Sequence, residues 1–207
     1  YTTLFRSNRH TDQTVNIYSA FLQNEWKNDR WGILIGGRLD KHNMVDNVIF
    51  SPRANLRFNP TQNINLRLSY SSGFRAPQAF DEDMHIENVG GTVAMIERAK
   101  DLKEEKSQSF SVSADMYHRF GAFQTNLLIE GFYTRLTDVF VLGKPYDRGD
   151  GILVKTRSNG PGAKVMGLTL EGKVAYLSIL QIQAGLTLQR SRYDEPHKWH
   201  DELTENQ

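Results

Sequence analysis

The sequence predicts an all-β protein, an antiparallel up-and-down meander of about eight long strands. Three observations support this fold class. Apolar and polar residues alternate with period 2 through most of the chain. Short and long connections between the alternating segments follow one another strictly. Charged residues within the segments fall on one face only.

The strands are predicted from the alternation itself, which places every second side chain on the same face of a sheet. The clearest alternating segments are Phe50 to Phe58, Ile64 to Tyr70, Phe110 to Met116, Leu168 to Tyr176 and Ile182 to Leu188. We expect most strands to have about 9 to 11 residues, enough to cross a bilayer at a tilt. From Thr14 to Trp26 the phase is ambiguous, because both parities carry large apolar residues. Thr92 to Glu105 has a helix-like pattern.

The connections predict which ends of the strands lie together. Tight turns are expected at Asn28-Asp29, at Pro60 to Asn63, at Phe120-Gly121 and near Leu177 to Leu180. Longer excursions are expected at Asp40 to Asp46, Gly73 to Lys106 and Gly143 to Gly162, and in the tail from Tyr193. In a meander all long loops then fall at one end, an asymmetry typical of outer-membrane barrels.

The charged residues also favour a membrane barrel. By parity, one face carries Arg53, Arg57, Arg67, Asp115, Glu130, Glu171 and Lys173, and the other face has no charge between the strand ends. A charge facing lipid at mid-bilayer costs about 2 to 4 kcal/mol, which explains such a segregation. A soluble sandwich would place the same apolar face inward. Its strands are usually about 5 to 6 residues long, however, so strand length and loop asymmetry favour the barrel.

Composition excludes several other classes. The net charge is +1, and no basic patch with interleaved aromatic residues predicts nucleic-acid binding. The chain has no cysteine, which excludes disulfide scaffolds and thiolate chemistry. The first seven residues, YTTLFRS, resemble the translated end of a sequencing adapter. We therefore expect 1–7 to be non-native and 8–207 to be an internal piece of an exported protein that begins without its signal peptide.

Seven motifs, taken together, resemble one family. They are FLQNEW, GGRLD, FSPRANLRFNPTQN, LRLSYSSGFRAPQAFDE, LKEEKSQSFSVSADM, GFYTRLTDVF and VMGLTLEG, in this order. From about Thr14 to Tyr193 the chain is similar to TonB-dependent outer-membrane receptors, and its wording is nearest to receptors of Bacteroidetes-like bacteria. One departure is Glu104, which stands where many relatives have proline.

The resemblance implies both a fold and a function. The fold would be an open section of a 22-stranded transmembrane β-barrel, with 8–207 as a partial barrel domain that lacks the plug. The function would be receptor-mediated uptake of a scarce nutrient (siderophore, cobalamin, haem or glycan) across the outer membrane of a Gram-negative cell. The implied partners are outer-membrane lipid, a nutrient at the external loops, and the TonB complex acting through the plug.

Several residues are candidates for structural or ligand-binding roles. In the motif GFRAP we expect Gly73, Phe74, Arg75 and Pro77 to form a structural corner, in which Pro77 ends ladder pairing. In the motif MGLTLEG we expect Gly167 and Glu171 to face the lumen, with Glu171 beside a basic residue. Candidate ligand-facing loop residues are Arg75, Asp81, Glu82, Asp83 and His85. The three acids could bind a hard cation, although a solvated acidic loop is the favoured interpretation.

Two alternative functions are open at this stage. A complete small barrel of about eight strands could serve a structural or adhesion role, which requires the first and last strands to pair. An outer-membrane enzyme would need a nucleophile and a base at the rim. No Ser-His-Asp set, paired catalytic carboxylates or three-ligand metal motif is evident: His197 and His200 have no third ligand nearby. We therefore predict no enzymatic activity, cofactor or metal site.

Overall fold

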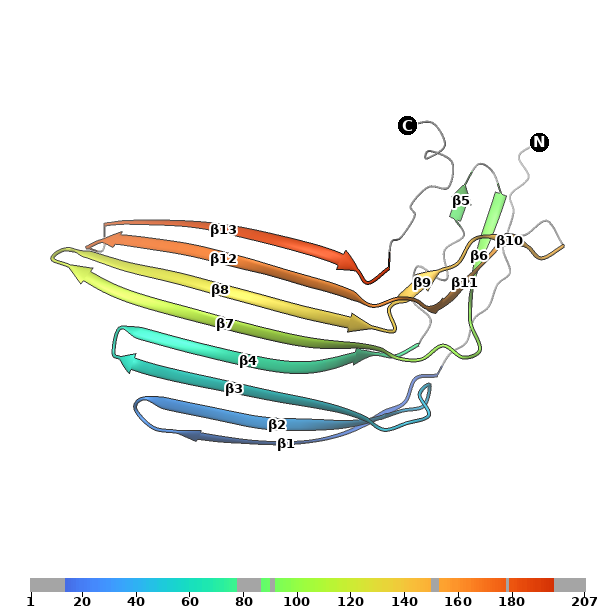
Figure 1. Ribbon diagram of the computed structural model, residues 1–207, viewed down its shortest axis with the longest axis horizontal. Helices are drawn as coiled ribbons and strands as arrows, with labels where there is room; N and C mark the ends of the chain where they lie inside the picture. The colour runs from blue at the N-terminus through green and yellow to red at the C-terminus, as the bar shows by residue number, and fades with distance from the viewer. Residues whose placement is uncertain (1–13, 78–86, 90–91, 150–152, 178, 196–207) are drawn as a thin grey trace.

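The computed structural model describes residues 14–77, 87–89, 92–149, 153–177 and 179–195 as two β-sheets (Figure 1). The larger sheet has eight strands in the order β1-β2-β3-β4-β7-β8-β12-β13, all antiparallel to their neighbours. Their bounds are Ile17–Lys27, Trp31–His42, Ile49–Thr61, Ile64–Arg75, Glu105–Phe120, Phe123–Thr137, Ala163–Tyr176 and Leu180–Tyr193. The predicted meander of eight strands is therefore confirmed.

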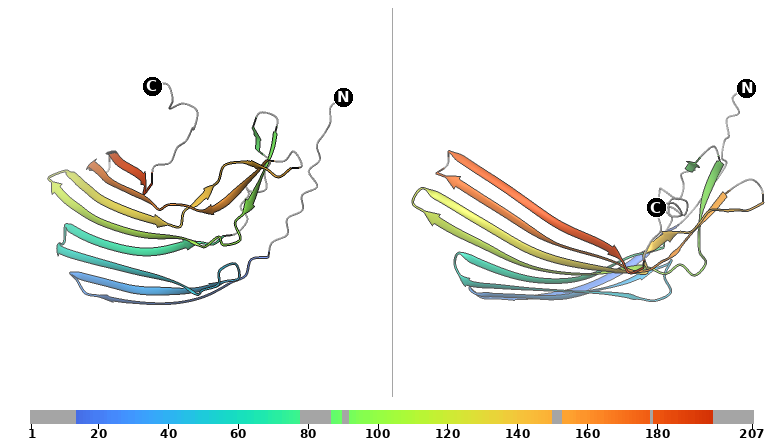
Figure 2. Two further views of the ribbon diagram at one scale, coloured as in Figure 1. Left: turned by 45° about the vertical axis from the view of Figure 1, so that its right-hand side comes forward. Right: turned by 45° about the horizontal axis from the view of Figure 1, so that its top comes forward.

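The large sheet is open and curved (Figure 2). Its edges are β1 and β13, which lie at opposite ends of the strand order and do not pair. The strands have 11 to 16 residues, so most are longer than expected. The extra residues lie at the long-loop end, where the ladders between β4, β7 and β8 continue past the apolar part of each strand to Arg75, Lys106 and Thr137.

In the large sheet the apolar face is the more exposed one and the polar face the less exposed one, the reverse of a soluble protein. On β7 the burial alternates, with Phe110 and Val112 exposed and the intervening Ser109, Ser111 and Ser113 only partly exposed. On β12 the alternation is the same: Leu168 and Leu170 are exposed, and the polar positions between them are not. Side chains on the inside of a curved sheet are crowded by their neighbours. The polar face is therefore concave, and the apolar face is convex.

The body of the large sheet has no buried apolar core. Among the described residues the buried hydrophobic side chains are Val45, Ile49, Ala76, Ile96 and Val154, all of which lie at the long-loop end or in the smaller sheet. Val45, Ile49 and Ala76 form a small cluster against which Phe74 packs. By contrast, Val112 in the middle of β7 is 58% exposed. A sheet that exposes its apolar face needs an apolar surrounding.

The turns and loops separate to the two ends of the sheet, as predicted. Tight turns join β1 to β2, β3 to β4, β7 to β8 and β12 to β13 at one end. In the β7–β8 turn, Gly121 has φ of 56°, a left-handed conformation that glycine adopts without steric cost. The long connections leave the other end, between β2 and β3, β4 and β7, and β8 and β12.

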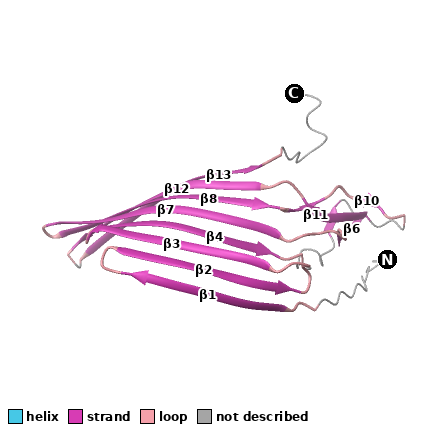
Figure 3. Ribbon diagram, turned by 60° about the horizontal axis from the view of Figure 1, so that its bottom comes forward, coloured by secondary structure: helices cyan, strands magenta, loops and turns pink. Residues whose placement is uncertain are grey.

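The long connections build the smaller sheet, which the sequence did not predict. It contains β5 (Glu87–Val89), β6 (Thr92–Arg98), β10 (Tyr146–Asp147) and β11 (Leu153–Asn159) in the order β10-β11-β6-β5, and β9 (Phe140–Leu142) pairs with β11. The helix-like interpretation of Thr92 to Glu105 is wrong, because β6 occupies its first half. Ladder pairing with β11 overrides the local pattern there. Figure 3 shows strands and loops throughout the described chain.

One glycine in β12 permits close packing on the concave face. A Cβ at Gly167 would lie 2.6 Å from the Phe132 ring and 2.7 Å from the Leu188 carbonyl oxygen. Real Cβ atoms do not approach backbone so closely, so β12 could not keep its place between β8 and β13. Gly172 lies on the same strand but on the convex face, and a Cβ there would meet nothing within 4 Å.

We therefore predict that Gly167→Ala destabilises the sheet by about 1 to 3 kcal/mol, the usual cost of overpacking. Gly172→Ala is the matched control and should be neutral or slightly stabilising, because alanine restricts the unfolded chain. Denaturant unfolding in detergent measures both. Equal midpoints for the two variants would show that the contact at Gly167 is not limiting.

Candidate functional site: the concave face and the loop sheet

The concave face of the large sheet has a positive net charge over β2–β4 and a negative net charge over β7, β8 and β12. Cross-strand partners share a face, so the register aligns Arg57, Arg67, Ser113 and Glu130 in one row. On β2, β3 and β4 this face carries Arg38, Arg53, Arg57, Arg67 and Arg75 and one carboxylate, Asp40. On β7, β8 and β12 it carries Glu105, Asp115, Glu130 and Glu171 against the two cations Arg119 and Lys173. An anion near this wall is therefore drawn toward β2–β4.

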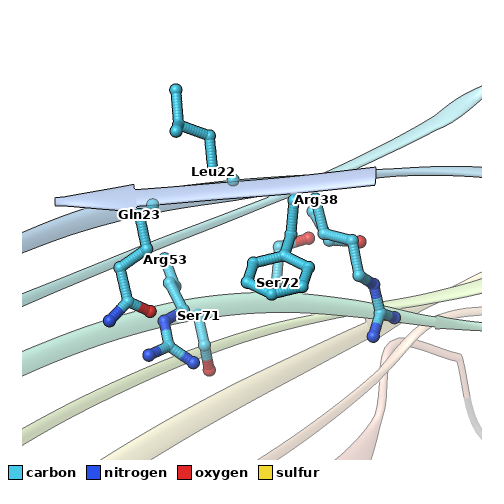
Figure 4. A pocket seen from close by; sticks show the side chains of 10 residues that line it. Leu22, Gln23, Arg38, Arg53, Ser71 and Ser72 are labelled. Carbon is cyan, nitrogen blue, oxygen red and sulfur yellow. The ribbon is translucent and has the colours of Figure 1, made fainter. Parts of the chain in front are cut away.

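A hollow on the cationic half has the chemistry to bind an anionic or hydroxylated group. Its lining includes Gln23, Arg38, Ser51, Arg53 and Ser71. Figure 4 shows Gln23, Arg53 and Ser71 on one side of β1, with Leu22 on the opposite side. The Ser51 side chain is buried, and its Oγ has no hydrogen-bond partner in the described structure.

The two arginines of this hollow differ in what holds them. Arg38 Nε donates to Asp40 Oδ2 at 2.7 Å. The Asp40 side chain is almost fully buried, and its Oδ1 also accepts from Ser19 Oγ at 2.5 Å. Arg53 makes no hydrogen bond or ion pair with any described residue. Its planar donor fork is thus available for a carboxylate or similar group.

A second hollow lies further toward the turns and contains a pair of like charges. Arg57 and Arg67 stand directly opposite each other, an arrangement that destabilises a sheet when nothing compensates it. Arg67 Nε donates to Asn65 Oδ1 at 2.8 Å, and the buried Nε of Arg57 has no described partner. Glu25 also lines this hollow but forms no ion pair with either arginine. The cationic half of the wall is therefore incompletely neutralised.

The smaller sheet (β5, β6, β9, β10 and β11), called the loop sheet from here on, joins two connections that are far apart in sequence. Strand β6 belongs to the β4–β7 connection and β11 to the β8–β12 connection, and they pair in parallel from Leu153 with Ala94 to Arg157 with Arg98. Ile96 and Val154 are buried in this sheet. Arg98 Nη1 also donates to the Pro77 carbonyl at 2.7 Å. The two connections form one folded unit at the long-loop end (Figure 2).

Asn159 joins the two long connections where they leave the large sheet. Its Oδ1 accepts from the Lys103 N–H at 2.7 Å, and its Nδ2 donates to the Lys103 carbonyl at 3.1 Å and to the Asp138 carbonyl at 2.8 Å. Asp138 follows β8 with φ of 54°, a left-handed conformation that redirects the chain out of the large sheet. One amide side chain thus fixes three backbone groups from both long connections.

The motif GFRAP lies at the end of β4 in the structure. Gly73, Phe74 and Arg75 are the last residues of β4, and Arg75 stands opposite Glu105 at the start of β7. The Arg75 guanidinium lies 5.6 Å from the centre of the Phe140 ring. Glu105 Oε2 accepts from the Phe140 N–H at 3.0 Å. Pro77 follows β4, and its carbonyl accepts the hydrogen bond from Arg98.

The other sequence candidates have mixed outcomes. Asp81, Glu82, Asp83 and His85 lie outside the described residues, as do residues 1–7, His197 and His200. Gly167 and Glu171 both lie on the concave face, in register with Phe132 and Leu128 of β8. The expectation of a basic partner for Glu171 is wrong: its Oε1 accepts from Gln183 Nε2 at 2.5 Å, because the directly opposite position of β13 is Gly185 and the next one toward the turn is Gln183.

The sequence predictions missed the hollow at Ser51 and Arg53 as a site. Parity placed Arg53, Arg57 and Arg67 on the polar face, but it did not show that they would form no ion pair with a carboxylate of the described residues. That information comes from the register of β2, β3 and β4. Among the described residues, no three His, Asp or Glu side chains gather as a metal site. No helix in the described part of the chain is long and apolar enough to cross a membrane.

Comparison with known proteins gives one family. The sequence model described as "TonB dependent receptor-like, beta-barrel" matches residues 1–206. No match was found among curated proteins.

Similar solved structures are outer-membrane and iron-related proteins. They include the siderophore receptor PirA from Pseudomonas aeruginosa (17% identity, TM-score 0.71, 87% of this chain and 35% of that one). Others are the FrpB iron transporter from Neisseria meningitidis (17%, 0.62, 86% and 26%) and the outer membrane transporter YddB from Escherichia coli (16%, 0.66, 86% and 25%). The chain thus spans about a third or less of these proteins, and the likeness at such identity concerns the fold.

We predict that Asn159→Ala loosens the loop sheet without unfolding the large sheet. Each lost hydrogen bond costs about 1 kcal/mol, so amide exchange in β6 and β11 should accelerate while exchange in β7 and β8 stays unchanged. Asn159→Asp is the informative control, because it keeps only the acceptor for the Lys103 N–H and should lie between the other two proteins. Unchanged exchange in β6 and β11 of the alanine variant would contradict this role of Asn159.

Proposed function

Because the chain belongs to the family of TonB-dependent receptor β-barrels, we propose that it forms part of the wall of a receptor that takes up a scarce nutrient across the outer membrane. The energy would come from TonB through a plug that lies outside this chain. The observation that carries the proposal is the reversed packing of the large sheet, with apolar side chains exposed on the convex face and arginines on the concave one.

The convex face has the dimensions of a membrane-spanning band. Tyr70, Phe110 and Tyr133 form a row of aromatic residues toward the loops. A second row of Phe120, Phe123 and Tyr176 lies at the turns. The rows are ten residues apart on β7, or about 23 Å at about 3.3 Å per residue and a tilt of about 45°. Outer-membrane barrels have an apolar band about 25 Å tall between two aromatic girdles, so this spacing supports a crossing of the bilayer.

The nutrient would be captured at the loop sheet and would then bind along the concave face. The loop sheet stands at the long-loop end, which in outer-membrane barrels faces the exterior. A nutrient caught there would next meet the hollows that contain Arg53, Arg57 and Arg67. An anionic iron chelate suits this wall best among siderophore, cobalamin, haem and glycan, and the names of similar structures, a siderophore receptor and an iron transporter, agree with that choice.

The loop residues are proposed for first contact with the nutrient. Asp81, Glu82, Asp83 and His85 belong to the β4–β7 connection, which also supplies β6 of the loop sheet. Arg75 is a weaker candidate, since its guanidinium lies over Phe140 at the end of β4. The alternative of a complete small barrel does not fit the sheet, because β1 and β13 lie at opposite edges.

Uptake by cells tests the proposed function. A strain that lacks the gene should lose TonB-dependent import of one labelled nutrient among a ferric siderophore, cobalamin, haem and a glycan. We expect the ferric siderophore to be affected, and Arg53→Gln with Arg67→Gln to lower its import several-fold while the receptor level stays constant. Import of all four at the wild-type rate by the deletion strain would contradict the proposal.

The membrane-facing side of β7 can be tested separately. Ala114→Arg places a charge on the convex face near the middle of the band between the aromatic rows and should cost about 2 to 4 kcal/mol of assembly free energy. Ser113→Arg is the control, because it adds the same side chain one residue along on the concave face, between the opposite charges of Arg67 and Glu130. The measurement is the amount of heat-resistant barrel in the outer-membrane fraction. A loss of the same size for both variants would exclude our assignment of the faces.

A further inference from the structure

The convex face carries a row of cations on the loop side of the aromatic row Tyr70, Phe110 and Tyr133. Arg135 of β8, Lys164 of β12 and Arg192 of β13 stand directly opposite one another in the ladder. This row lies two residues closer to the loops than the row that contains Tyr133, Met166 and Arg190. We call the set Lys106, Arg135, Lys164, Arg190 and Arg192 the basic rim. These five share the convex face with Phe110 and Leu188 by parity.

The basic rim is only partly neutralised by described residues. One carboxylate, Asp194, lies 3.3 Å from Lys164 Nζ and 4.0 Å from Arg135 Nη2. Lys106 Nζ lies 3.0 Å from Glu104. Five cations and two carboxylates leave a local charge of +3, in a chain whose net charge is +1. Like charges that stand opposite each other in a sheet are unfavourable unless something compensates them.

The rim is present at one end of these strands only. At the turn end, the convex face of β7, β8, β12 and β13 presents His118, Phe120, Phe123, Thr125, Val174, Tyr176, Leu180 and Ile182, with no lysine or arginine. Long cationic side chains that merely reach from lipid to water would suit both ends equally. On β1–β4 this face carries one cation at the loop end, Lys41, whose Nζ donates to the carbonyls of Val45 and Asp46. Two properties of the rim therefore need an explanation: its positive charge, and its presence at the loop end alone.

We propose that the basic rim binds the phosphate groups of the glycolipid headgroups that surround the receptor in the outer leaflet. This inference rests on the proposed placement in the outer membrane. Headgroup phosphates lie just beyond the hydrocarbon, the level at which the rim follows the row of Tyr70, Phe110 and Tyr133. Arginine matches phosphate with two parallel hydrogen bonds, and lysine adds a point charge. The side chain of Arg135 is 56% exposed and can reach such a group.

The test uses the full receptor, extracted from outer membranes in mild detergent and delipidated. Native mass spectrometry would follow its binding of added bisphosphorylated lipid A and of the same lipid with its phosphates removed. The variant R135Q/K164Q/R192Q removes three charges from the rim. The control K27Q/R119Q/K173Q removes three charges from the concave face and the turn end.

We expect the rim variant to bind the phosphorylated lipid about a hundredfold more weakly than wild type, from about fivefold per cation near a headgroup surface. The control should bind like wild type, and the dephosphorylated lipid should bind equally weakly to all three proteins. R192Q alone, with an expected loss of about fivefold, serves if the triple variant does not assemble.

The outcomes separate the two proposals. A receptor that is absent from the outer-membrane fraction would overturn the proposed function and the rim with it. A receptor that sorts there but binds both lipids equally, or loses no binding in the rim variants, would overturn the rim alone.

Discussion

The structure depends on one constraint: each strand of the large sheet must send alternate side chains into two different surroundings. The pleat alternates side-chain direction at every residue, so a strict period of 2 yields one apolar and one polar surface. Ladder pairing satisfies the backbone groups between the strands, as a bilayer requires. With Val112 exposed and Ser113 partly buried, the surface that is usually hidden in a soluble protein is here the outer one.

This constraint also determines where function can lie. Polar and charged residues are expelled from the middle of the convex face, so arginines such as Arg53 and Arg57 collect on the concave one. Chain segments outside the apolar band are not bound by this alternation. The long connections fold there into the loop sheet, in which Val154 is buried. The ends of the convex face are the remaining places for charge, and Arg135 and Arg192 occupy the one near the loops.

Sequence periodicity predicted the eight-stranded meander, its tight turns and the faces of Arg67 and Glu130, because these features depend on neighbours within one strand or hairpin. It could not predict the loop sheet: β6 and β11 are separated by the whole of β7 and β8, and their parallel pairing leaves no local signal. For the same reason the sequence predicted a basic partner for Glu171, whereas the structure has Gln183 there. Which residues meet across strands depends on register, which a single strand does not encode.

The most direct measurement of the central claim is the accessibility of spin labels placed one at a time along β7, from Phe110 to Met116, in the receptor reconstituted in lipid. Oxygen concentrates in the bilayer, and a charged nickel complex stays in water. The account predicts that oxygen collisions peak at 110, 112, 114 and 116 and fall at the positions between, with period 2. Collisions without alternation, or with their maxima at Ser111, Ser113 and Asp115, would contradict it.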